Sequence, residues 1–301
     1  MPEARGAGPA PHTIGGQALI EGVMIRSPRW WAVAVRRPEG TIHTESHRVG
    51  GYLEEHPKLA RPLIRGVLAL GEAMSIGIRA LQISARQSTG QEAEIGRREM
   101  GFAVALALVF VTGLFVIAPA LLVRGGGGAS GLFVFEPALI VHNLFEGLVR
   151  IAIFLAYVLV VSLLPDIRRV FQYHGAEHKV ISAFEHGEPT VEGARRFSTV
   201  HVRCGTNFLF VVMLLAVVVF SVVGRTPIWW RIVSRFLLLP VVAAISYEVL
   251  RIAARHERNL LIRAITWPGL LLQRVTTRTP DDGQVEVALA SLDELLQRET
   301  D

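Results

Sequence analysis

The residues of this chain that could do chemistry gather in one short segment. Residues 171–178 read Phe-Gln-Tyr-His-Gly-Ala-Glu-His, so His174, Glu177 and His178 form a His-x-x-Glu-His pattern. On a helix the two histidines share a face and Glu177 lies beside them. In zinc proteases of the inverted pattern, such histidines hold the metal and the glutamate is the general base for a water. The segment therefore predicts a divalent metal site, with zinc as the first candidate.

The same residues also have a plainer interpretation. Two close histidines and a glutamate are only moderately specific for a metal. Hydrogen bonds to backbone or to acidic side chains would satisfy buried imidazoles equally well. From this segment alone, a metal site and a pair of hydrogen-bonded buried histidines are equally supported.

Three further donors could complete a metal shell. His201 and Cys204 are three residues apart at the start of an apolar span, and Glu248 follows His178 by 70 residues within another apolar span. A carboxylate inside a membrane is costly and is therefore a functional candidate. For Cys204 the sequence favours a small buried residue over a ligand. An ion pair with Arg251 or Arg255 is the alternative for Glu248.

The composition indicates a membrane protein. Of 301 residues, 51% are hydrophobic, and the mean hydropathy is +0.41, too apolar for an ordinary soluble protein. The net charge of +5 comes almost entirely from arginines that flank apolar spans, which argues against a nucleic-acid binder. A single cysteine excludes an intramolecular disulfide. The first 30 residues lack a continuous apolar core, so we expect no cleavable signal peptide.

Four apolar spans are predicted, over residues 101–123, 139–164, 205–223 and 232–250. The fourth is weaker because it contains Arg235, Pro240 and Glu248. Arginines crowd three regions that would then share one side of the membrane: Arg97 and Arg98; Arg168, Arg169, Arg195, Arg196 and Arg203; and Arg251, Arg255, Arg258 and Arg263. The positive-inside rule therefore places both termini and the His-x-x-Glu-His segment in the cytoplasm.

Residues 63–85 form a mostly apolar segment with one polar stripe. Arg65, Glu72, Arg79 and Arg86 recur every seven residues. We expect a helix that lies in the membrane interface or packs on the bundle. A fifth span is less favoured because it would invert the orientation of the N-terminal region.

The N-terminal region, the segment between spans two and three, and the C-terminal tail are predicted to lie outside the membrane. Residues 31–36 and 41–45 predict two strands joined by a turn at 38–40, and residues 15–28 predict a strand with close backbone approaches. Glu21 and Arg26 are its candidate functional groups, or an ordinary surface pair. Pro165 and Asp166 open a predicted helix over residues 166–186, which Gly187 ends. Apolar residues at helical spacing predict a short amphipathic helix within residues 280–301.

Span two carries a polar stripe of its own. His142, Glu146 and Arg150 are each four residues apart, so Glu146 and Arg150 can pair along one helix face. A cavity lining or a proton path would use such residues, but an interhelical lock is the simpler interpretation and the one we prefer.

Several longer stretches resemble one known family. They are residues 16–26, 166–179, 203–208, 238–248, 268–273 and 276–287. Together they are similar to the YqhQ-like bacterial membrane proteins, the family of domain of unknown function 1385, over residues 13–290. The resemblance implies a multi-pass protein of the bacterial cytoplasmic membrane, often labelled a predicted metal-dependent enzyme, with no established reaction. The matching positions are His174, Glu177, His178, Cys204 and Glu248.

The expected fold is mainly α: a polytopic membrane protein with about four transmembrane helices and a small N-terminal cytoplasmic region that holds a β-hairpin. The parts are residues 1–60, an interfacial or membrane-packed helix at 61–98, a membrane domain at 99–279 and a C-terminal tail helix at 280–301. Three functions remain open. A metal-dependent hydrolase would use Glu177 as base, and His174, His178, His201, Cys204 and Glu248 as candidate ligands. A scaffold or assembly factor would bind an unidentified protein partner, and a transporter would use the polar groups of the spans. Lipid is the expected surrounding, nucleic acid is not an expected partner, and the sequence does not give the oligomeric state.

Overall fold

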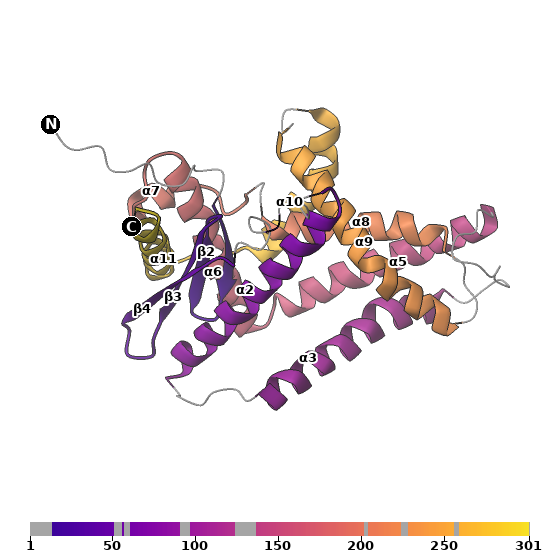
Figure 1. Ribbon diagram of the computed structural model, residues 1–301, viewed down its shortest axis with the longest axis horizontal. Helices are drawn as coiled ribbons and strands as arrows, with labels where there is room; N and C mark the ends of the chain where they lie inside the picture. Colours follow the sequence, from indigo (N-terminus) through magenta and orange to yellow (C-terminus); the bar gives the residue numbers. More distant parts are fainter. Residues whose placement is uncertain are drawn as a thin grey trace.

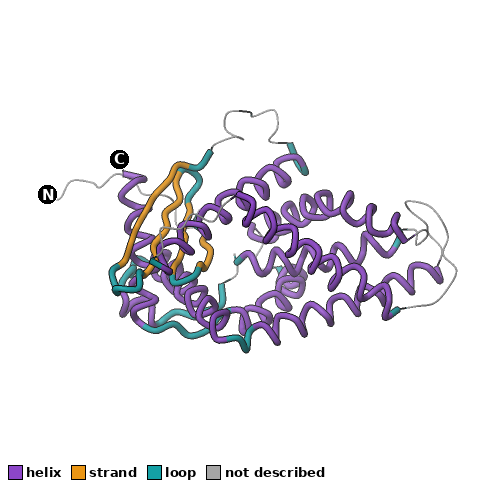
Figure 2. The backbone as a smooth tube through the Cα atoms, turned by 90° about the horizontal axis from the view of Figure 1, so that it is seen from below, coloured by secondary structure: helices purple, strands orange, loops and turns teal. Residues whose placement is uncertain are grey.

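The computed structural model describes residues 14–50, 56, 61–90, 97–123, 137–201, 204–223, 228–255 and 259–300. The chain is mainly helical, with one small antiparallel sheet near its N-terminus. Figure 1 shows two regions: the sheet with helices α6 (Pro165–Glu185), α7 (Val191–Arg195) and α11 (Asp282–Thr300) on one side, and a bundle of apolar helices on the other. Helix α2 runs along the boundary between them, and Figure 2 shows the same division from below.

The sheet has four antiparallel strands in the order β1-β2-β3-β4, namely Gly15–Leu19, Gly22–Arg26, Trp30–Arg36 and Ile42–Arg48. The predicted hairpin is confirmed as β3 and β4. The single strand expected over residues 15–28 is wrong, because the chain reverses at Ile20 and Glu21 to form a second hairpin. Glu21 has a φ of 54°, a left-handed conformation that lets this tight turn close.

Strands β2 and β3 are apolar up to their terminal arginines, Arg26 and Arg36, because both faces of the sheet are covered. One face, with Val23 and Ala34, packs on Tyr173 of α6 (Pro165–Glu185) and on Leu292 of α11 (Asp282–Thr300). The other face packs on α2 (Ile64–Thr89) through Val33, Val35, Ile76, Ala80 and Ile83. The predicted C-terminal amphipathic helix is confirmed, and it is a wall of the sheet's core.

Helix α2 joins the two regions. Its first half packs on α9 (Ile228–Arg255), where a Cβ at Gly66 would lie 3.1 Å from the Cα of Ala244. Its second half packs on the sheet, where Gly77 meets Gln17. Because half of its length covers a sheet, the helix follows the boundary of the bundle. The helix thus packs on both the bundle and the sheet, and it is also long and apolar enough to cross a membrane, the option that the sequence analysis disfavours.

The bundle contains α3 (Arg97–Thr112), which continues through the π-helical turn η3 (Gly113–Ile117) into α4 (Ala118–Leu122), together with α5 (Pro137–Val161), α8 (Gly205–Ser221), α9 and α10 (Leu260–Thr276). Among the described residues, four helices are long and apolar enough to cross a membrane: Ile64–Thr89, Gly101–Leu122, Pro137–Val161 and Ile232–Ile252. These four helices are not the four predicted spans. Helix α8 is apolar but has only 17 residues, whereas α2 is long and apolar enough to cross a membrane.

The polar stripe of α5 is a lock between helices. Glu146 is 1% exposed and accepts hydrogen bonds at 2.8 Å from Arg150 on its own helix and from Arg235 of α9. Arg150 also donates through Nε to the carbonyl of Phe115, within the π-helical turn, at 2.7 Å. The preferred interpretation of this stripe is therefore supported, and Arg235 adds a partner that the pattern did not predict.

Replacing Glu146 with leucine is expected to lower the stability of the bundle by about 3–5 kcal/mol, because it leaves two buried guanidinium groups without their shared carboxylate. The thermal unfolding midpoint in detergent, followed by tryptophan fluorescence, measures the change. Glu286→Leu is the matched control, since it removes an exposed partner of Arg36 and should cost less than about 1 kcal/mol. Equal midpoints for the two variants would contradict the lock.

Candidate metal centre

Helix α6 places the metal-binding candidates on a fixed face. Leu164 is extended, Pro165 opens the helix and Asp166 lies in its first turn, while Gly187 follows its end with a φ of 78°. This confirms the helix predicted over residues 166–186. Tyr173, Ala176 and Val180 face the sheet core, so the helical spacing turns His174 and His178 to an adjoining face. That face looks toward the start of α8 and the end of α10.

Backbone carbonyls fix both imidazole rings. The Nδ1 of His174 donates to the carbonyl of Thr276 at 2.8 Å, and the Nδ1 of His178 donates to the carbonyl of Thr199. Because a carbonyl can only accept, each Nδ1 carries the hydrogen, and each neutral ring keeps its lone pair on Nε2. Burial lowers the pKa of His178 to about 3, so that ring is neutral at physiological pH.

Cys204 completes a group of three donors. It is the N-cap of α8, and its Sγ lies 3.2 Å from the Nε2 of His174. The ligand atoms of His174, His178 and Cys204 all lie within 4.8 Å of one another. The Nε2 of His178 is buried and has no hydrogen-bond partner among the described residues. A buried imidazole nitrogen without a hydrogen-bond partner, close to a second imidazole and a thiol, fits the role of a metal ligand.

Glu177 lies beside this group. It is 4% exposed, and burial raises its pKa to about 8, with a smaller lowering by His174 and a further raising by Cys204. The carboxyl is therefore neutral at pH 7 in the metal-free protein. Strand β1 leaves room for it, because a Cβ at Gly16 would lie 2.7 Å from Oε1 of Glu177. The close backbone approach predicted in residues 15–28 is thus explained by this carboxyl.

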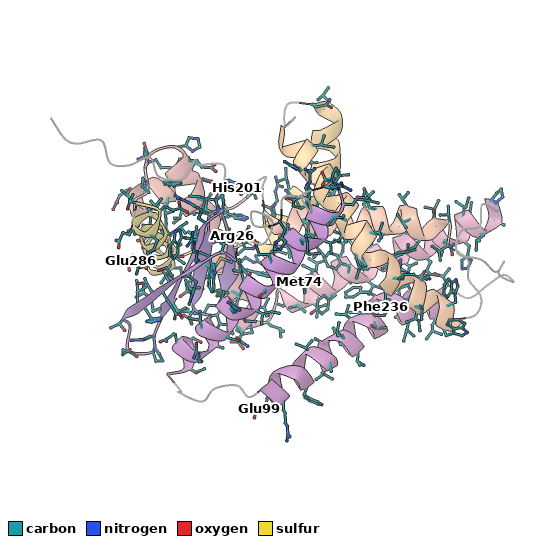
Figure 3. The ribbon with its side chains drawn as sticks, in the orientation of Figure 1. Arg26, Met74, Glu99, His201, Phe236 and Glu286 are labelled. Carbon is teal, nitrogen blue, oxygen red and sulfur yellow. The ribbon has the colours of Figure 1, made fainter. Side chains whose placement is uncertain are left out.

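His201 borders the group without joining it. Its ring centroid is 5.7 Å from that of His178, and its Nε2 is 3.6 Å from the carboxylate of Glu185. The side chain of Gln273 clamps its backbone with two hydrogen bonds, of 2.9 and 3.0 Å. Figure 3 labels His201 at the junction of the two regions.

Glu248 is not brought to the three donors. Its carboxylate forms a two-pronged ion pair with Arg65 of α2, with Arg65 Nε at 2.7 Å. The expected alternative, a pair with Arg251 or Arg255, names the wrong arginine. The third-ligand interpretation of Glu248 fails for a physical reason, because α9 presents this residue to α2. The segments that converge are α6, the start of α8 and the end of α10.

Gly175 is a functional position that residue chemistry alone does not reveal. A Cβ there would lie 2.0 Å from the carbonyl oxygen of Arg278, whose N–H donates to the carbonyl of Phe171 at 2.8 Å. The glycine lets the segment after α10 lie against α6, and this contact presents the Thr276 carbonyl to His174. A glycine in the middle of a helix is the sequence signal that marks such a close approach.

Gly175→Ala is expected to weaken zinc binding about tenfold or more, because it displaces the segment that orients His174. Competition with a chromophoric chelator measures the affinity. Gly205→Ala is the matched control, since its Cβ would meet open space at the start of α8. An affinity of Gly175→Ala equal to that of the control would contradict the role of this contact.

The unfolding free energy of the metal-free protein is expected to fall as the pH rises from 6.5 to 8. The pKa of Glu177 is raised from 4.5 to about 8 by folding, so here the folded chain retains a proton that the unfolded chain has released. The lowered pKa of His178 adds an opposite slope that fades above its ordinary pKa of 6.5 and is common to the wild type and the variant. Unfolding of chelator-treated wild type and Glu177→Gln tests this, and an equal pH slope in both would refute a protonated Glu177.

Comparison with known proteins shows the family to which the chain belongs. The chain matches the family described as a protein of unknown function (DUF1385) over residues 61–298, a range that includes His174, Glu177, His178 and Cys204. It is 33% identical to the uncharacterized protein YqhQ of Bacillus subtilis (strain 168) over 308 residues, which cover 96% of this chain and 94% of that protein. No solved structure matches. The chain therefore belongs to the DUF1385 family.

Proposed function

We propose that this protein is a metal-dependent hydrolase whose centre lies where its apolar helices meet its sheet region. The observation that carries the proposal is the closeness of two imidazoles and one thiol, whose ligand atoms all lie within 4.8 Å of one another, beside the buried carboxyl of Glu177. Structural zinc sites commonly use four protein ligands, whereas catalytic sites use three and leave one position open.

The donor set fits zinc. Two neutral imidazoles and one thiolate are nitrogen and sulfur ligands of the kind that zinc prefers, and both rings are already oriented by carbonyls on their Nδ1 side. Burial raises the pKa of the Cys204 thiol, so metal binding must release its proton. A zinc ion held there would supply an acidified water and a Lewis acid for polarising the substrate.

Glu177 is the proposed general base. In the metal-free protein its carboxyl is neutral because it is buried. A cation held by the three donors would favour the ionised form of Glu177, which is the form that can accept a proton. The base then takes the proton of the attacking water and passes it to the leaving group. Gly16 keeps β1 close against the carboxyl and so limits its movement.

The location favours a substrate that reaches the membrane face. Four described helices are long and apolar enough to cross a membrane, and the centre lies at the junction of the bundle with the sheet region. From the arginine distribution we propose that this junction and both termini lie on the cytoplasmic side of a bacterial cytoplasmic membrane.

The test combines metal content with hydrolysis. Detergent-purified wild type should hold about one equivalent of zinc by mass spectrometry, and a His174→Ala/His178→Ala double variant should hold none. Glu177→Gln should retain the metal. Zinc-loaded wild type in nanodiscs is then screened against ester, amide and phosphodiester substrates, and Glu177→Gln should reduce any turnover about 100-fold or more.

Two outcomes would overturn the proposal. Full turnover in Glu177→Gln would remove the carboxyl from the reaction. Metal that binds to wild type while no substrate class is hydrolysed would indicate a structural centre in a membrane scaffold.

A further inference from the structure

A cavity of about 540 Å³ lies between the sheet and α2, and it shares no lining residue with the metal centre. Its walls come from the sheet and from α2. Trp31 and Arg48 belong to β3 and β4, while Val67, Gly71, Glu72 and Arg79 lie along one face of α2. The cavity is therefore built by the same packing that joins the sheet to the bundle boundary.

The charges that line this cavity are unbalanced. Glu72 is already engaged, because Arg26 donates to its carboxylate at 3.3 Å. Arg48 and Arg79 form no ion pair or hydrogen bond through their side chains with any residue in the described part of the chain, and both are exposed. Two unengaged guanidinium groups at one cavity favour a phosphate, which they bind as planar, two-pronged donors.

The rest of the cavity is apolar, and it continues into an apolar surface. Trp31 and Val67 contribute apolar wall, and Val67 also begins an outward stripe along α2 with Met74, Ile78 and Leu81. These four side chains are 43–59% exposed. Figure 3 labels Met74 on α2 and Phe236 on α9, the helix against which the first half of α2 packs. The stripe therefore adjoins a helix that can cross a membrane.

We propose that this cavity binds one anionic phospholipid of the surrounding membrane. The lipid phosphate lies between Arg48 and Arg79, and the acyl chains follow Val67 and Met74 along the outward face of α2. The two arginines recognise the phosphate ester of the headgroup. The adjoining apolar stripe binds the acyl chains and so selects a lipid over a free phosphate. The bound lipid would fix α2 at the membrane surface. This proposal is independent of the hydrolase.

Native mass spectrometry tests the site on the full chain. The protein is reconstituted in nanodiscs of phosphatidylcholine with phosphatidylglycerol and then released, and the retained lipid is counted. Wild type should retain about one phosphatidylglycerol per protein. The Arg48→Gln/Arg79→Gln variant should retain roughly one tenth of that amount or less. Arg86→Gln/Arg98→Gln removes the same charge from exposed helix positions outside the cavity and should retain the lipid. Equal losses in both double variants would reduce the effect to general surface attraction and overturn the site.

A second variant fills the cavity without changing charge. A Cβ at Gly71 meets nothing within 4 Å, so Gly71→Leu is compatible with the fold and occupies the lipid's space. It should lose the lipid, while Gly101→Leu, which also meets open space, should retain it. Lipid retained by Gly71→Leu would overturn the site. So would displacement of the lipid by glycerol phosphate at equal concentration, which would show a site for a soluble phosphate ester.

Discussion

Two hydrogen bonds from imidazole to backbone decide what the centre can do. The Nδ1 of His174 and the Nδ1 of His178 each donate to a carbonyl, of Thr276 and Thr199 respectively, so each Nε2 keeps its lone pair, and the Nε2 of His174 lies 3.2 Å from the Sγ of Cys204. If either ring turned over, its hydrogen would point into the donor group and metal binding would fail. The position of the two carbonyls is therefore the requirement that the surrounding structure must meet.

The fold meets this requirement with separate anchors. The ammonium of Lys179 donates to the carbonyls of Arg195 and Phe197, at 3.0 and 2.6 Å, and so holds the segment that leads to Thr199. Gly175 lets the segment after α10 lie on α6, which positions Thr276. The turn of the first hairpin is tied to α6 because Glu21 accepts hydrogen bonds from Arg169 and Tyr173. The sheet, α6 and the end of α10 thus form one support for the centre.

Residue types and spacing predicted only part of the donor group, since a small buried residue was favoured for Cys204, and His201 and Glu248, also candidate ligands, lie outside it. The four-residue interval made His174 and His178 neighbours, and the position of Cys204 at the start of an apolar helix brought its thiol to them. The partners of long-range contacts could not be predicted in this way. Periodicity shows which face of α2 is polar, but it does not show that Arg65 meets Glu248. The backbone carbonyls that accept hydrogen bonds from the imidazoles cannot be predicted from a side-chain pattern either, because every residue has a carbonyl.

X-ray absorption at the zinc edge of the zinc-loaded protein tests the central claim most directly. We expect two imidazole nitrogens at about 2.0–2.1 Å and one sulfur at about 2.3 Å from the zinc, with the sulfur absent in Cys204→Ser. A shell of oxygen ligands alone, or a spectrum that His174→Ala/His178→Ala leaves unchanged, would contradict the account.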